Sequence, residues 1–300
     1  MTANLRRDDT GSLEVRRITL HHVSKALEAL DGIPPSDIAV HTARKHLQRA
    51  RASLRLMREA LSDATYARVN TALRDVARQL SPVRDKKMLL DALQKLTSRY
   101  HGSAHAMPLG TFETVLRRSY VEARTKLIEP LSLSSVRKEL RQVHDRGARW
   151  RVVRKGWSVL GRGLKRVYSA GRNIFSKTQR ESSVADLHEW RKQVKCLWHQ
   201  LELLAPLWPG LIGKPADQAH RLAEYLGDDH DLAILREQVA AHPDAFRDGG
   251  SQGALLALID RRRIELLDKA IILGKRLYED RPQEFASRFG QYWRDWHHAT

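Results

Sequence analysis

The stretch from His41 to Leu61, HTARKHLQRARASLRLMREAL, places several cationic side chains at helical spacing. At about 100° per residue, Arg44, Lys45 and Arg55 fall within about 60° of His41, whereas the apolar residues cluster on the opposite side. No acidic residue occurs in this stretch before Glu59. Because uncompensated like charges on one helix face repel each other, we expect this face to bind an anionic partner.

The same pattern occurs again in HEWRKQVKCLWHQLELLA, from His188 to Ala205. When His188 is aligned with His41, Arg191 falls on Arg44, and a lysine follows each arginine. The apolar residues of the second stretch again share the face opposite the basic residues. The sequence therefore predicts two equivalent helices, each with one apolar and one basic face.

A further pair of segments repeats downstream of these two helices. The segment RQLSPVRDKKMLL (Arg78–Leu90) resembles EYLGDDHDLAILR (Glu224–Arg236), with Asp85 over Asp231. Both matches have nearly the same spacing along the chain, so they indicate an internal duplication of far longer period than a solenoid repeat. We expect two helical halves related by a pseudo-twofold axis, which would bring the two basic helices together around a basic central surface.

Composition limits the kinds of partner and compartment. The chain has 300 residues, and its 53 Lys and Arg against 35 Asp and Glu give a formal net charge of +18. Such a charge implies a polyanionic partner: nucleic acid, an acidic membrane surface or polyphosphate. Cys196 is the only cysteine, so no internal disulfide can form. With no signal-peptide core and no apolar run of roughly 18 residues, we expect a soluble cytoplasmic protein.

Helical periodicity without convincing alternating strands predicts an all-α fold. We expect a disordered N-terminus over residues 1–12 and then a single domain over 13–297, made of halves at about 13–150 and 160–297. Each half is predicted to have a lead helix and five more. The predicted helices of the first half lie at about 13–30, 36–61, 62–80, 83–100 and 111–128, and its last helix begins at residue 134. Those of the second half lie at about 164–175, 184–207, 215–226, 229–241, 254–278 and 282–296.

The helix boundaries rest on capping and helix-breaking residues. Ser36 or Asp37 is predicted to cap the first basic helix, and Ser62 or Asp63 the helix after it. Residues 134–180 form the most basic region, with fourteen Lys and Arg against two acids. We place the joint between the halves near Gly147–Gly163, where repeated glycines argue against a continuous helix.

The HxxRK pattern, occurring twice on predicted helices, resembles the CHAD domain, an all-α family named for its conserved histidines. VRDKKMLL (Val83–Leu90) is similar to the RD segment in the first half of that family, and LGDDHDLAIL (Leu226–Leu235) to its second-half counterpart. GLKRVYSAGR (Gly163–Arg172) is similar to the helix that precedes the second histidine helix. With the C-terminal run over 255–296, the resemblance covers nearly everything from about residue 13 to 297.

The resemblance implies two similar helical bundles whose basic central surface binds inorganic polyphosphate, often at polyphosphate granules. Some members are fused to a CYTH-type triphosphatase domain, for which these residues leave no room. We therefore expect a stand-alone, non-catalytic binding module without cofactor or metal, with granule proteins as further partners. The chain departs from the family at Gln48, Cys196 and Trp198, where the family usually has a basic residue.

The candidate residues suit a phosphate chain chemically. Arg offers bidentate donors to phosphate oxygens and Lys a compact charge, and a helix repeats one face every ~5.4 Å. Histidine gains charge near pH 6.5, so we expect tighter binding below about pH 6.5. The predicted polyphosphate-binding residues are His41, Arg44, Lys45, Arg49, Arg55, Arg84, Lys87, Lys165, Arg166, Arg172, His188, Arg191, Lys192, Lys195 and His199.

Nucleic acid is the strongest alternative partner. The net charge suits it, and Trp150 and Trp157 in the basic joint could stack on bases. No helix-turn-helix, zinc-finger or RNA-recognition signature occurs in the sequence, and tryptophans in helical bundles mostly belong to the core. Adventitious binding of nucleic acid is nevertheless expected for a chain of this charge.

A metal-dependent phosphohydrolase is the weaker alternative. It would use the cluster Asp228, Asp229, His230 and Asp231, because His and Asp pairs ligate metals in all-α phosphohydrolases. Such a site needs further His and Asp ligands from other helices, and the sequence shows no second cluster of that form. The simpler interpretation is that Asp228 or Asp229 caps a helix, with Asp231 near its positive N-terminus.

Overall fold

The computed structural model describes residues 5, 11–32, 34–100, 108–128, 130–246 and 249–298. These residues form an all-α fold, as predicted, and no strand occurs among them. The predicted disordered N-terminus lies largely outside the described residues, and the first helix begins at Gly11 rather than at residue 13. The helices are α1 (Gly11–Ala29), α2 (Asp37–Leu56), α3 (Asp63–Gln79), α4 (Ser81–Arg99), α6 (Gly110–Ile128), α7 (Pro130–Gly147), α8 (Trp157–Thr178), α9 (Val184–Leu204), α10 (Pro209–Ala241), α11 (Gly249–Leu277) and α12 (Pro282–His298).

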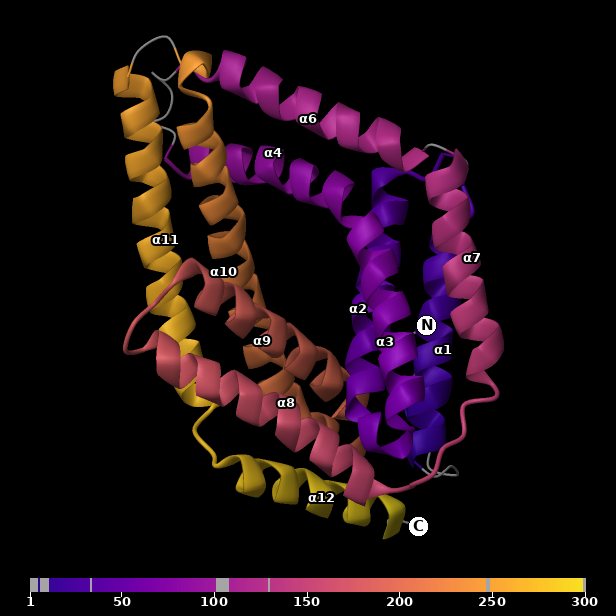
Figure 1. The fold of residues 1–300 in the computed structure, drawn as a ribbon. Helices are drawn as coiled ribbons and strands as arrows, with labels where there is room; N and C mark the ends of the chain where they lie inside the picture. Colours follow the sequence, from indigo (N-terminus) through magenta and orange to yellow (C-terminus); the bar gives the residue numbers. More distant parts are fainter. Residues whose placement is uncertain are drawn as a thin grey trace.

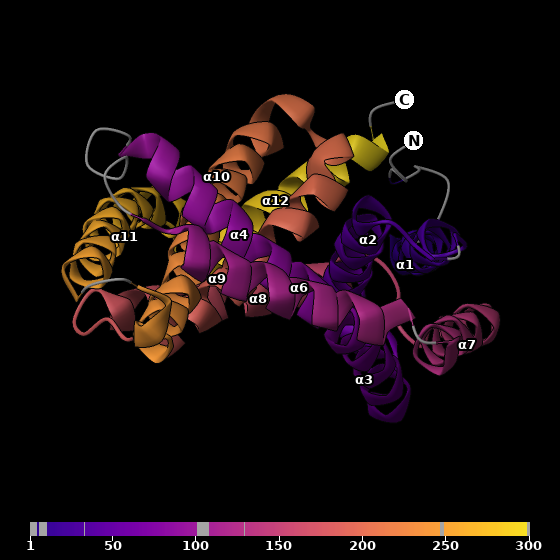
Figure 2. The same ribbon diagram turned by 90° about the horizontal axis from the view of Figure 1, so that it is seen from above.

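The helices surround a central space, with α4 and α6 crossing between its two sides (Figure 1). On one side α1, α2, α3 and α7 pack together, and on the other α9 and α11 pack against α10 while α12 packs on α8. Helix α2 contacts both α8 and α9, and α4 reaches α10 and α11. Figure 2 shows α4 and α6 spanning from α11 to α2 and α7. The two predicted halves therefore share extensive packing.

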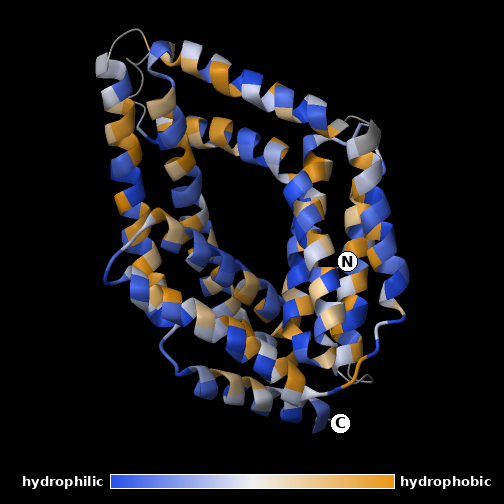
Figure 3. Cartoon of the chain, viewed as in Figure 1, coloured by the Kyte–Doolittle hydropathy of each residue, from blue (hydrophilic) through white to orange (hydrophobic). Residues whose placement is uncertain are grey.

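The hydrophobic core also crosses the boundary between the predicted halves. A large cluster of buried side chains extends from Val15 in α1 through Trp190 in α9 to Phe289 in α12. A smaller cluster joins α4 and α6 to α10 and α11, where the rings of Phe112 and Phe246 stack 5.2 Å apart. Figure 3 shows the resulting alternation of apolar and polar residues along the helices. Each of the two clusters therefore contains side chains from both predicted halves.

Serine side chains begin three of the helices. Ser36 accepts a hydrogen bond from the Ala39 amide at the start of α2, and Ser62 does the same for the Thr65 amide at the start of α3. Ser183 caps α9 through the Asp186 amide, 3.0 Å away. Each cap satisfies a backbone donor that the first turn leaves unpaired, and in both predicted places the serine rather than the aspartate caps the helix.

The prediction of two helices over 215–226 and 229–241 was wrong, because one continuous helix, α10, covers both. Leu226 and Leu232 are both buried, so the core holds the chain helical through the glycine and the acidic residues between them. Asp228 and Asp229 accordingly lie inside the helix and cap nothing. The second half thus has a lead helix followed by four helices, α9 to α12, rather than five.

The joint between the halves is shorter than predicted. Residues 148–156 connect α7 to α8, and Gly156 has a φ of +78°, which a glycine adopts without strain. The amide of Val153 donates to the carbonyl of Ala60, and Trp150 is buried. Helix α8 then continues through Gly161, so the predicted interruption by glycines is wrong there. Among the described residues, no helix is long and apolar enough to cross a membrane.

Candidate anion-binding cavity

Four helices, α2, α4, α9 and α10, line a cavity of about 620 Å³. We call it the central cavity. Its wall combines basic, acidic and histidine side chains from segments that are far apart in the sequence. The charged and histidine residues that line it are His41, Arg44, Lys45, Arg84, Asp85, Lys95, Arg191, Lys195, His199, His220, Glu224, Asp228, His230 and Asp231.

The two faces predicted for α2 explain how its basic residues reach the central cavity. Val40, Ala43, Leu47, Ala50 and Leu54 are all buried in the core. The opposite face of the helix, at helical spacing, then points into the cavity. The residues of that face that line the cavity are His41, Arg44, Lys45 and Gln48.

Helix α9 is built in the same way. Its apolar face is buried, with Trp190, Val194 and Leu197 fully inaccessible. Its polar face contributes Arg191 and Lys195 to the central cavity. Because α2 and α9 pack against each other, the two predicted basic helices do come together at one site.

Arg44 is held in place by three neighbouring groups. Its guanidinium donates to the carbonyl of Ala77 over 3.2 Å and to the hydroxyl of Ser81, and it lies 3.7 Å from the carboxylate of Asp85. Asp85 therefore pairs with Arg44 on a different helix and not with its sequence neighbour. These contacts fix the position of a partly buried cation at the edge of the cavity.

Arg191 and Lys195 lack direct partners in the part of the chain that the structure describes, although the carboxylate of Asp231 attracts both. Among the described residues, neither side chain has a hydrogen bond or ion pair, and the Nε atom of Arg191 is fully buried without a partner. Burial, with the nearby Arg191 and Arg44, lowers the pKa of Lys195 to about 7. Both side chains are half-buried, and a partly desolvated cation without a direct partner is unfavourable unless a ligand neutralises it. Both side chains thus point to an anionic ligand.

Helix α10 forms an acidic wall of the central cavity. Glu224, Asp228 and Asp231 lie on its cavity face, where the described part of α10 places no Lys or Arg. Burial raises the pKa of Asp231 to about 6. Asp228 pairs with Lys95 of α4 over 3.3 Å. The cavity is therefore polarised, with cations on α2, α4 and α9 and carboxylates on α10.

The histidines around the cavity are mostly uncharged at neutral pH. Partial desolvation, reinforced by Arg84, Lys45 and Arg44, lowers the pKa of His41. Burial and the neighbouring Lys192 and Arg191 likewise lower the pKa of His188. The Nδ1 atom of His188 lies 3.3 Å from that of His230, whose pKa burial lowers to about 4. His41 and His188 can therefore donate hydrogen bonds as neutral rings before they add charge.

The structure brings about half of the predicted residues to the central cavity. Those that line it are His41, Arg44, Lys45, Arg84, Arg191, Lys195 and His199. His199 is buried there and its Nδ1 lies 3.0 Å from Glu202, so it acts partly as a structural group. His188 lies directly behind the wall against His230. Lys87 shares a smaller cavity with His41 and pairs with Asp91 over 3.0 Å.

The remaining predicted residues lie away from the central cavity and have partners of their own. Arg49 lies 3.4 Å from Glu202, and Lys192 lies 3.1 Å from Glu189 on the same helix. Arg55 lies beside the buried Cys196. The cations of the lead helix α8 make polar contacts with other parts of the protein. Lys165 donates to Gln283, Arg166 pairs with Glu59, and Arg172 donates to the Tyr278 carbonyl.

Lys95 and His220 line the cavity but were not singled out from the sequence, and His230 was considered there only as a metal ligand. Lys95 follows Arg84 by three helical turns on α4, so its spacing would have placed it on the same face. His220 stacks on the Trp198 ring with centroids 4.1 Å apart, and the ring of His230 lies tilted against that of His188, with centroids 4.4 Å apart. Neither contact could be predicted from the sequence, because each joins side chains on two different helices.

The tryptophans considered for nucleic-acid stacking have no free faces of that kind. Trp150 is buried, and the ring of Trp157 packs against Trp293 with centroids 5.9 Å apart. As for the phosphohydrolase alternative, the described residues contain no group of three or more His, Cys, Asp or Glu side chains placed to hold a metal ion.

Fold and site together define an all-α protein whose two basic helices meet at a cationic central cavity. The family model for the CHAD domain matches residues 17–240, and the chain belongs to this family. The match includes α2, α4, α9 and α10, which line the cavity. No curated protein matches the chain.

Proposed function

We propose that this protein binds inorganic polyphosphate in the central cavity and does no chemistry on it. The observation that carries the proposal is the pair Arg191 and Lys195, two cavity cations without a partner among the described residues. Membership of the CHAD family supports the same ligand class. Cations that make no direct contact with a carboxylate of the protein are suited to a ligand that supplies several negative charges at once.

The shape of the site also suits a linear phosphate chain. Polyphosphate offers about one negative charge per unit and no base or sugar to recognise. Arg44 and Arg84 are partly buried and held by neighbouring groups, so their guanidinium groups are already oriented. Fixed guanidinium groups bind phosphate oxygens with little loss of side-chain entropy. The exposed Lys45 and Lys95 add mobile charge at the rim.

We infer that the two halves arose by duplication and present equivalent cations to the chain. Arg44 of α2 and Arg191 of α9 occupy aligned positions in the two HxxRK motifs and both line the cavity. Asp85 lies 3.7 Å from Arg44. Asp231, which aligns with Asp85, is the carboxylate that acts most strongly on Arg191. Each half would therefore contribute one arginine and one carboxylate to the cavity. A role at polyphosphate granules in the cytoplasm is part of the same proposal.

A binding titration with long-chain polyphosphate tests the proposal. The double variant Arg191→Ala/Lys195→Ala should bind at least about tenfold more weakly, since each charged hydrogen bond contributes about 1.5–3 kcal/mol. Lys165→Ala/Arg166→Ala is the matched control, because it removes the same charge from α8, away from the cavity. Equal losses in both doubles would mean that binding follows net charge alone, and would refute the assignment of the site.

Duplex DNA at equal charge serves as the competitor in the same titration. Polyphosphate should displace DNA, because the cavity gathers cations from α2, α4 and α9, whereas Trp150 and Trp157, the rings considered for base stacking, pack against the protein itself. If DNA competes equally and the double variant binds like wild type, nucleic acid becomes the better assignment.

A further inference from the structure

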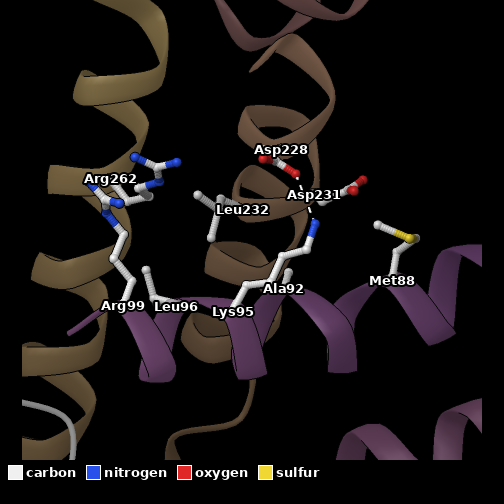
Figure 4. A pocket seen from close by; sticks show the side chains of 9 residues that line it. All are labelled: Met88, Ala92, Lys95, Leu96, Arg99, Asp228, Asp231, Leu232 and Arg262. Atoms are coloured by element: carbon white, nitrogen blue, oxygen red, sulfur yellow. Dashed lines mark hydrogen bonds and ion pairs between the residues drawn. The ribbon is translucent and has the colours of Figure 1, made fainter. Parts of the chain in front are cut away.

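A second cavity, of about 250 Å³, lies beside the central cavity between α4, α10 and α11 (Figure 4). We call it the side pocket. Four side chains line both cavities: Met88, Lys95, Asp228 and Asp231. The two cavities are therefore adjacent, and one ligand can occupy both.

The side pocket differs from the central cavity because much of its wall is apolar. Ala92, Leu96 and Leu232 line it and are all buried. Figure 4 shows Arg99 and Arg262 at the end of the pocket away from Asp231. Both guanidinium groups are held by Glu265 of α11, at 2.9 and 2.8 Å. An apolar wall with oriented donors at one end suits a flat heterocycle that has acceptor atoms on its edge.

Carboxylates lie where the two cavities meet. Asp228 and Asp231 stand one turn apart on α10, and Lys95 lies 3.3 Å from Asp228 (Figure 4). Carboxylates are poor neighbours for a phosphate chain but good acceptors for hydroxyl groups. In dinucleotide-binding folds a carboxylate accepts hydrogen bonds from ribose in the same way. A sugar placed between a base and a phosphate chain would meet these groups.

We propose that the side pocket binds the base of a purine nucleoside polyphosphate whose ribose lies at Asp228 and whose phosphates enter the central cavity. The order along the cavities, apolar pocket, carboxylates and then cations, matches the order base, ribose and phosphates in such a ligand. The volume is below the about 300–1,000 Å³ of clefts that enclose whole drug-sized ligands, and fits one bicyclic base. The inference rests on the proposed function, because the phosphates use the polyphosphate site.

The test compares ligands that have equal numbers of phosphates. ATP and GTP are titrated against tripolyphosphate, without divalent cations and at fixed ionic strength. We expect at least one purine triphosphate to bind about tenfold more tightly than tripolyphosphate, which corresponds to about 1.4 kcal/mol from burial of the base. Ala92→Phe, which fills the side pocket, should remove this advantage and leave tripolyphosphate binding unchanged.

Asp228→Ala gives a readout of opposite sign for the two ligands. Tripolyphosphate should bind more tightly to the variant because a negative charge is lost, whereas the advantage of the nucleotide should shrink because its ribose loses an acceptor. Asp217→Ala is the matched control, since Asp217 is an exposed acid on the same helix that lines neither cavity. It should change neither the affinities nor their ratio.

The inference fails if neither purine triphosphate binds more tightly than tripolyphosphate to the wild-type protein. The proposed function would stand in that case, because tripolyphosphate binding measures it separately. If Ala92→Phe does not fold, as judged by circular dichroism and a thermal melt, Asp228→Ala decides alone. A nucleotide advantage that survives Asp228→Ala unchanged would overturn the placement of the ribose.

Discussion

Lys195 shows at the scale of one residue how this protein combines stability with binding. Most cations of the chain have a carboxylate partner or face solvent, whereas Lys195 is partly buried beside Arg191 and Arg44. Such a residue is costly in the free protein, since its neighbours repel it and water cannot solvate it fully. A bound polyanion reverses both effects. Side chains with this property are better markers of the site than basic residues in general.

Binding should weaken with rising pH because of Lys195. Its pKa of about 7 in the free protein rises when phosphate binds, so the protonated form is favoured by the ligand. Affinity is therefore highest below pH 7 and falls as pH rises through 7. We expect about a tenfold loss for polyphosphate between pH 6.5 and 8.5 at constant ionic strength. Lys195→Met should bind weakly at both values; a variant that keeps the wild-type pH dependence would contradict this role.

Substitution of Asp231 should strengthen polyphosphate binding, which is the opposite of the effect expected at Lys195. Burial raises its pKa to about 6, so its carboxylate is charged at pH 8 and largely protonated at pH 5. Asp231→Asn should therefore strengthen polyphosphate binding at pH 8, by up to about fivefold, and change it little at pH 5. The measurement is a titration at both pH values, with Asp217→Asn as the control. Weaker binding at pH 8 would show instead that Asp231 is needed to orient Arg191.

At the scale of the helix, glycines in α8 allow close packing rather than interrupting the helix. A Cβ built on Gly163 would lie 2.1 Å from the carbonyl oxygen of Leu56, at the end of α2. One on Gly171 would lie 2.2 Å from the hydroxyl of Tyr278. The glycines thus let α8 approach its neighbours closely, and they are compatible with a helix whose position is fixed by packing.

Gly163→Ala should destabilise the protein by about 1–3 kcal/mol, because the new methyl group meets backbone atoms that cannot move aside independently. Gly213→Ala is the matched control. Gly213 also lies inside a helix, α10, but nothing lies within 4 Å of a Cβ there, so that substitution should stabilise the protein by up to about 1 kcal/mol. Chemical denaturation of both variants measures the difference; equal changes would show that helix propensity and not close packing governs Gly163.

The sequence could predict features that depend on local periodicity. The two-faced helices α2 and α9, the Ser36 and Ser62 caps and the all-α class all follow from residue spacing and local hydrogen bonding. The continuity of α10 through Gly227 and the glycine packing of α8 could not be predicted, because both depend on neighbours distant in sequence. For the same reason the sequence could not predict that Lys165 and Arg166 lie outside the cavity. Their partners, Gln283 and Glu59, lie on other elements.

At the scale of the whole molecule, the net charge of +18 and the central cavity have one combined consequence. Self-repulsion destabilises the compact state, and the cavity cations of α2, α4 and α9 contribute to it. A ligand that binds only the folded protein stabilises it by RT ln(1 + [L]/Kd), about 2.7 kcal/mol at one hundred times Kd. Polyphosphate should therefore stabilise the fold much more than simple salt of equal ionic strength.

Thermal unfolding measures this coupling directly. Polyphosphate at a concentration well above Kd should raise the Tm of the wild-type protein by about 5 °C or more, since about 1 kcal/mol corresponds to about 2–4 °C in large domains. Arg191→Ala/Lys195→Ala should have a higher Tm than wild type without ligand, because two partly desolvated cations that repel each other are gone. The rise in its Tm with polyphosphate should be smaller. Lys165→Ala/Arg166→Ala should show the full rise. If both double variants respond alike, the stabilisation comes from charge spread over the surface and the cavity is not where the polyanion binds.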